Sequence, residues 1–176
     1  WMPSTREGQE IVLVALPLFH VYGMLVGMSY AVQSGASMVM IPNPRDSKDV
    51  LTSIDKYQPT IFPGAPAMYN AINVHPDVLA GKYNVRSIKA CISGSAPLMR
   101  ETKERFEALT GGKLVEGYGL SEAPTATHCN PLEGETRIGS IGVPFPDIDC
   151  KIVSLDDGVT ELPVGEIGEL VLKSPS

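Results

Sequence analysis

The sequence predicts an α/β fold, a mostly parallel sheet flanked by helices, with the start of a small β subdomain at its C-terminal end. Near-continuous apolar runs such as residues 11–16 indicate strands that are buried on both faces. Strand and helix patterns alternate about every 20 to 25 residues, the spacing of βα units. After Pro131 the pattern changes, because glycines and prolines cluster from Gly134 to Pro146.

The first half of the chain predicts strands and helices in alternation. Residues 36–41 form an apolar run that indicates a second buried strand, which Pro42 ends. In residues 47–57 apolar side chains recur at helical spacing, and Ser47 is placed to cap that helix. The expected strands are 11–16, 36–41 and 60–62, and the expected helices are 19–33, 47–57 and 67–74.

The second half continues the alternation and then becomes all-β. Pro97 stands at the expected start of a helix at 98–109, and Gly111 ends that helix. We therefore expect an α/β subdomain over residues 1–133, followed by a linker and the start of a β subdomain over 134–176. The remaining expected strands are 88–93, 113–116, 148–154 and 169–173.

Composition excludes several classes of protein. The net charge of −6 argues against a nucleic-acid binder, which usually presents a basic face. No stretch of about twenty apolar residues occurs, so we expect no membrane span, while a peripheral membrane contact stays open. Trp1 is not a natural start, and both ends of the chain read as cut from a longer protein.

Three cysteines indicate a reducing cytoplasm better than a disulfide framework. Cys91, Cys129 and Cys150 are odd in number and match no zinc spacing. Cys91 and Cys150 lie in apolar strand patterns, so we expect both to be small buried residues. A polar linker precedes Pro76, and we expect His75 within it to be exposed, while nothing fixes a role for His128.

The most informative motif is Glu-Gly-Tyr-Gly-Leu-Ser-Glu at residues 116–122. It leaves the end of an expected parallel strand, which is where α/β folds place ligands. Tyr118 offers a flat face for a nucleobase, Ser121 a hydroxyl for phosphate, and Glu122 an oxygen ligand for a hard cation such as Mg²⁺. Together these point to ATP. On the local pattern alone, a glycine-rich turn with a capping serine is an equal alternative.

Two further stretches meet the same edge of the expected sheet. Gly94-Ser95-Ala96-Pro97 joins a strand to a helix, and backbone N–H groups there can meet a polar ligand. A plain strand-to-helix turn is the alternative. His20 follows the first strand, and a histidine beside an apolar helix is either structural or catalytic.

Four stretches in this order resemble the core motifs of the adenylate-forming superfamily of acyl-CoA synthetases, adenylation domains and luciferases. Within that superfamily the chain is most similar to long-chain fatty acid–CoA ligases. The resemblance implies a two-step reaction, in which a carboxylate and ATP give an acyl-adenylate, and coenzyme A then displaces AMP. The stretches are PLFHVYGM, ISGSAPL, EGYGLSEAPTATHCNP and GSIGVPFP.

The resemblance also implies a role for each matching residue. Ser121 would contact the α-phosphate, Glu122 would hold Mg²⁺, and His20 would lie beside the acyl carboxylate. Most relatives have threonine where Ser121 stands, and some long-chain relatives have an aromatic gate near Met24. The implied nucleotide-binding residues are Gly94, Ser95, Ala96, Pro97, Glu116, Gly117, Tyr118, Gly119 and Ser121, and the implied acyl-tunnel residues are Gly23, Met24 and Gly119.

Parts of the superfamily's machinery do not occur in this sequence. The triphosphate loop, the aspartate that binds the ribose and the C-terminal domain with its catalytic lysine have no counterpart here. We therefore expect the central part of a fatty acid–CoA ligase, inactive in isolation. The alternatives are an aryl or other carboxylate–CoA ligase, an adenylation domain that loads a carrier protein, and a non-catalytic nucleotide-binding module. No oligomeric state is predicted.

Overall fold

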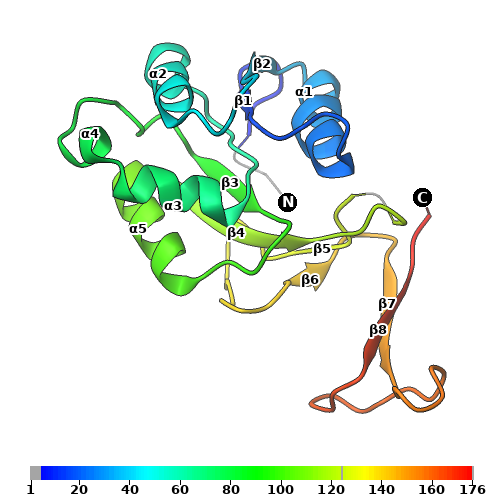
Figure 1. The fold of residues 1–176 in the computed structure, drawn as a ribbon. Helices are drawn as coiled ribbons and strands as arrows, with labels where there is room; N and C mark the ends of the chain where they lie inside the picture. The colour runs from blue at the N-terminus through cyan, green and yellow to red at the C-terminus, as the bar shows by residue number, and fades with distance from the viewer. Residues whose placement is uncertain (1–4, 124, 176) are drawn as a thin grey trace.

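A parallel sheet forms the centre of the computed structural model, which describes residues 5–123 and 125–175. In Figure 1, β1 (Ile11–Val14) lies beside β2 (Ser37–Met40), and β3 (Ala90–Ser93) lies beside β4 (Lys113–Tyr118). Ile61 joins the two pairs, because it makes parallel bridges to Val12 and to Ala90. The order is therefore β2-β1-Ile61-β3-β4, which confirms the predicted mostly parallel sheet.

Helices cover both faces of this sheet. One face packs on the larger core, to which Leu13, Tyr69, Phe106 and Leu114 contribute. The other face packs on the helix made by η1 and α1, where Ala31 meets alternate residues of β1. Strand β1 is thus apolar on both sides, as its sequence predicts. The helices are η1 (Gly23–Ser29), α1 (Tyr30–Gln33), α2 (Ser47–Tyr57), α3 (Pro66–Val74), α4 (Pro76–Leu79) and α5 (Arg100–Thr110).

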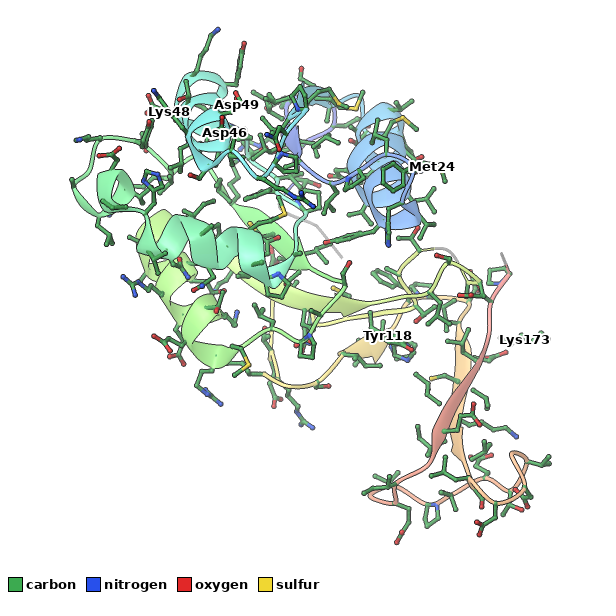
Figure 2. All side chains as sticks on the ribbon, in the orientation of Figure 1. Met24, Asp46, Lys48, Asp49, Tyr118 and Lys173 are labelled. Atoms are coloured by element: carbon green, nitrogen blue, oxygen red, sulfur yellow. The ribbon has the colours of Figure 1, made fainter. Side chains whose placement is uncertain are left out.

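Three details of the predicted helices were wrong, although the bounds of the helix at 47–57 are confirmed. Asp46, not Ser47, caps α2, because its carboxylate accepts hydrogen bonds from the backbone N–H groups of Lys48 and Asp49 (Figure 2). Helix α5 begins at Arg100, so Pro97 lies in an extended loop before it. Seven residues of the helix expected at 19–33 form a π-helix, a distortion that is common at functional sites.

Several predictions of burial and of short elements were also wrong. Strand β2 is the edge of the described sheet, and Met38 and Met40 are 40% and 48% exposed. Cys150 is exposed on β7, while Cys91 is buried as expected. Residues 60–62 contribute bridges and not a full strand. His75 is half-buried, and it separates α3 from the short α4, which has no clear sequence signal.

The C-terminal quarter departs from the parallel pattern. Strands β5 (His128–Cys129) and β6 (Val143–Pro144) extend the sheet from β4 in antiparallel fashion. Strands β7 (Asp149–Val153) and β8 (Glu169–Lys173) form a separate antiparallel ribbon, which points away from the rest in Figure 1. These match the predicted strands at 148–154 and 169–173, and the domain boundary at 134 stays a prediction. No helix among the described residues is long and apolar enough to cross a membrane.

A buried ion pair fixes α5 against β4, the strand that carries the candidate motif. The Lys103 ammonium donates to Glu107 at 2.6 Å and to the Leu114 carbonyl at 2.6 Å. The Glu107 carboxylate also accepts from the Leu114 N–H at 2.8 Å. Because each charged group has several partners, the pair holds the register between helix and strand.

Candidate functional site

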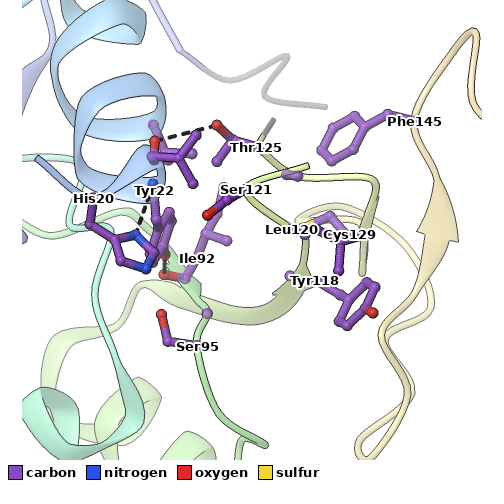
Figure 3. A pocket seen from close by; sticks show the side chains of 16 residues that line it. His20, Tyr22, Ile92, Ser95, Tyr118, Leu120, Ser121, Thr125, Cys129 and Phe145 are labelled. Carbon is purple, nitrogen blue, oxygen red and sulfur yellow. Dashed lines mark hydrogen bonds between the residues drawn. The ribbon is translucent and has the colours of Figure 1, made fainter. Parts of the chain in front are cut away.

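A cavity of about 310 Å³ opens where the ends of β3 and β4 meet the start of the helix that contains η1. In Figure 3, His20 and Tyr22 come from the helix side, and Tyr118 comes from the end of β4. The three stretches that the sequence singled out therefore do meet in space. The predicted site residues that line the cavity are His20, Gly94, Ser95, Gly117, Tyr118, Gly119 and Ser121.

The remaining predicted site residues do not line this cavity. Ala96 and Pro97 follow Ser95 on the exposed loop. Met24 is 39% exposed on the outer side of η1 (Figure 2). Gly23 is buried, and a Cβ there would stand 2.3 Å from the Pro17 carbonyl oxygen, so its visible role is close backbone packing.

The loop after β4 is held tightly across the cavity. A Cβ on Gly119 would lie only 1.5 Å from the Thr125 carbonyl oxygen, so no larger residue fits this loop as it stands. The Thr125 hydroxyl donates to the Val21 carbonyl at 3.3 Å, and the Thr127 N–H donates to the Tyr118 carbonyl at 2.8 Å. Ser121 is exposed at the tip of this loop. These contacts hold both sides of the loop that carries it.

His20 is anchored through one ring nitrogen. Its Nδ1 accepts a hydrogen bond from the Tyr22 backbone N–H at 3.1 Å, drawn as a dashed line in Figure 3. A neutral imidazole has one donor and one acceptor nitrogen, so this contact assigns the proton to Nε2. His20 therefore presents an N–H donor and caps the start of the helix at the same time.

Tyr22 is a cavity residue that sequence reasoning missed. Its hydroxyl donates to the Ile92 carbonyl at 2.5 Å, and Tyr69 donates to the same oxygen at 2.8 Å. Burial raises the pKa of Tyr22 well above its usual range, so the hydroxyl stays a donor. A Cβ on Gly94 would stand 3.0 Å from the Tyr22 ring, so any larger residue there would have to displace the ring slightly. The one sequence feature that could have identified Tyr22 as a cavity residue is its aromatic side chain between His20 and Gly23.

Glu116 lies on β4 two residues before Tyr118, opposite Ser93 of β3 in the strand register. Burial raises the pKa of the Glu116 carboxyl. Oε2 of Glu116 and Oγ of Ser93 are buried, and no described residue hydrogen-bonds to either atom. Ser95, in the adjoining loop, adopts the left-handed backbone conformation with φ 70°, a strain that is typical of ligand sites. Unpaired buried acceptors behind such a loop suit a polar ligand.

A second cavity, of about 510 Å³, adjoins the first. Ile92, Thr125, Cys129 and Phe145 border both (Figure 3). Sequence reasoning missed it, because its walls are ordinary apolar residues from separate segments. Its apolar lining comes from Leu25, Val26, Ile61, Pro63, Ala90, Ile92, Leu132 and Phe145.

Comparison with known proteins agrees with this arrangement. The sequence model of a family described as AMP-binding enzyme matches residues 1–176. The chain belongs to the AMP-binding enzyme family. This confirms the resemblance that the four motifs indicate.

Individual AMP-binding proteins match over nearly all of this chain. A long-chain-fatty-acid–CoA ligase of Bacillus subtilis (strain 168) is 46% identical over 175 residues, which are 99% of this chain and 30% of that protein. The anthranilate CoA ligase AuaEII in complex with anthranoyl-AMP superposes with a TM-score of 0.87 at 28% identity, covering 97% of this chain and 32% of its own. ATP-bound MatB from Rhodopseudomonas palustris gives 0.82 at 27% identity, covering 96% and 32%. The chain thus spans about 30% of the length of the curated relative.

The other ionisable residues of this AMP-binding chain have simpler environments. Glu122 is exposed on the loop beside Ser121, and no group of three or more metal-ligating side chains gathers among the described residues. His128 is buried on β5 against Thr127 and the Tyr118 ring, and burial lowers its pKa. Burial raises the pKa of the Cys129 thiol to about 12, which disfavours a nucleophilic role.

Proposed function

We propose that this chain is part of an ATP-dependent fatty acid–CoA ligase of the long-chain type. The observation that carries the proposal is the pair of adjoining cavities, one bordered by the Tyr118–Ser121 motif and the other apolar. A nucleotide and an aliphatic acid would meet where the two cavities join. The names of the curated relatives support the acid–CoA ligase class.

The nucleotide would occupy the space between the Tyr118 ring and the loop at Ser95. An aromatic face stacks on any base, and the unpaired Glu116 oxygen can accept a hydrogen bond from an exocyclic amino group. The Ser121 hydroxyl would donate to the α-phosphate. The ATP-bound and acyl-adenylate-bound structures that superpose on this chain support such an assignment.

Magnesium is compatible with the residues present. Mg²⁺ usually takes one or two protein carboxylates and completes its shell with phosphate and water. Glu122 supplies a single exposed carboxylate next to Ser121, which suits an ion held mainly by triphosphate. The ion would neutralise phosphate charge. The chain's own residues position the reactants.

The proposed ligase reaction has two steps. In the first, a carboxylate oxygen forms a bond to the α-phosphorus of ATP, the bond from that phosphorus to the α,β-bridging oxygen breaks, and pyrophosphate leaves with this oxygen and the electron pair. Both reactants are anionic, so the Nε2–H of His20 and the Ser121 hydroxyl would lower the barrier by donating to charged oxygens. In the second, the thiolate of coenzyme A attacks the acyl carbon, and AMP leaves.

The apolar cavity favours an aliphatic acid, but the structural comparison keeps an aryl acid as a second candidate. The anthranilate CoA ligase superposes closely on this chain. A carrier-protein-loading domain and a non-catalytic nucleotide-binding module are further alternatives, since the chain spans about 30% of its curated relative. We also propose a cytoplasmic location, which the free thiols of Cys91, Cys129 and Cys150 support.

Acid-dependent pyrophosphate release tests the proposal in the full-length protein that contains this chain. We expect release with palmitate and little with benzoate, and none from the isolated chain. Glu122→Gln is expected to lower kcat/KM by about 100-fold or more, whereas Glu101→Gln on exposed α5 is expected to leave it unchanged. Preference for benzoate would favour the aryl ligase. ATP binding without release for any acid would favour the non-catalytic module.

A further inference from the structure

The helix formed by η1 and α1 runs along the cavities from one end to the other. Tyr22 borders the first cavity, Val26 borders both the first and the second, and Tyr30 and Gln33 border the second. These positions recur about once per helical turn, so they form one face of the helix.

A third cavity, of about 450 Å³, adjoins the far end of the second one. Tyr30 and Gln33 border both, and the new walls are polar, with Arg6, Glu7 and Ser34. The apolar character of the second cavity therefore stops at the turn that carries Tyr30. An aliphatic chain gains free energy up to this point and none from the charged surroundings beyond it.

Tyr30 is better suited than Gln33 to form the end wall. Its ring is half-buried and packs against the small core cluster of Val12, Val14 and Ile61. Gln33 is exposed at the end of α1, and its side chain has more freedom to move aside. Gly27 keeps the helix close to the sheet, because a Cβ there would already stand 3.3 Å from Val14. The position of the Tyr30 ring is thus fixed by packing.

We propose that Tyr30 ends the acyl cavity and sets the maximum length of the acyl chain. This inference rests on the proposed function. Each methylene buried before the wall contributes about 0.8 kcal/mol, a factor of about four in kcat/KM. Activity should therefore rise with each added methylene until the chain reaches Tyr30, and then level off or fall.

A series of saturated straight-chain acids from hexanoate to eicosanoate tests this in the full-length protein. In Tyr30→Ala, and to a smaller degree in Tyr30→Leu, the rise in kcat/KM should continue to acids at least two carbons longer than in the wild type. Tyr30→Phe keeps the ring and should keep the wild-type limit. Val32→Ala is the matched control, because Val32 is 69% exposed on the same helix and borders none of the three cavities.

The outcomes separate this inference from the proposed function. If Tyr30→Ala or Tyr30→Leu keeps the wild-type KM for ATP and the wild-type chain-length limit, Tyr30 is not the end wall. An equal shift in Val32→Ala would also overturn it, since the effect would then be general to the helix. If no acid supports pyrophosphate release in the wild type, the proposed function is wrong, and the inference about Tyr30 is then wrong as well.

Discussion

The two ends of the joined cavities are built in different ways. At the polar end, backbone and glycines approach so closely that an added Cβ would lie 1.5 Å from Thr125 at Gly119, 2.9 Å from Ile92 at Gly117 and 3.0 Å from Tyr22 at Gly94. At the apolar end, the walls are side chains on a helix and on strand ends. An added side-chain atom at the polar end therefore forces its neighbours to move, most of all at Gly119, whereas single substitutions can reshape the apolar end.

The largest expected effect comes from adding one methyl group to the loop at the polar end, and the same addition on the helix beside the apolar end is its comparison. Gly119→Ala forces the loop away from Thr125, which displaces Ser121. A displacement of about 1 Å costs about 100-fold in rate, so kcat/KM should fall by at least that factor. Gly27→Ala, on the helix that borders the apolar cavity, places a Cβ 3.3 Å from the Val14 side chain, which has to shift by only a few tenths of an ångström, so kcat/KM should stay within a few-fold of the wild type. Steady-state pyrophosphate release measures both, and equal losses would contradict the contrast.

A second substitution asks whether the polar end serves the nucleotide alone. Tyr118→Ala removes the proposed stacking face, and base stacking contributes about 1–3 kcal/mol, so KM for ATP should rise by about 5- to 160-fold. Tyr118→Phe keeps the ring and should keep the wild-type KM. The KM for the acid should not change in either variant. A larger rise in the KM for the acid than for ATP would place Tyr118 at the wrong end.

The smallest expected effect concerns stability and pH. Burial raises the pKa of Glu116, so its carboxyl stabilises the fold below its ordinary pKa of 4.5, and this contribution is lost as pH rises through the folded-state pKa. Glutamine is not ionised, so Glu116→Gln removes the destabilisation that ionisation of the buried carboxyl causes. The Tm at pH 7.5 should therefore rise, by at most about 2 °C. Thermal melts should show the gap closing as pH falls toward 4.5. A gap that is constant with pH would argue against a buried, titrating carboxyl.

Much of the fold follows from the sequence because its strands and helices have strong periodic patterns. The strands at 148–154 and 169–173 and the helix at 47–57 are found almost residue for residue. The two-residue strands β5 and β6 could not be found, because such short segments have no period. Their pairing depends instead on contacts with β4, which tertiary structure alone supplies.

The candidate site was predictable at its polar end and not at its apolar end. Glycines, a histidine and hydroxyls mark the polar end, and the proposed chemistry uses those residue types. The apolar cavity is lined by Leu25, Ile61 and Leu132, which look like any core residues in sequence. The exposure of Met38 and Cys150 was missed for a similar reason, since apolar composition does not reveal which strand lies at a sheet edge.

The edge strand β2 has a practical consequence for handling the protein. Within the part of the chain that the structure describes, β2 pairs only with β1, so its outer row of backbone N–H and C=O groups is open. The exposed side chains of Met38 and Met40 add apolar surface beside that edge, which favours association. An open apolar edge is a template for strand addition by a second copy. At high concentration, separate copies of this chain are therefore expected to associate through β2 and to aggregate.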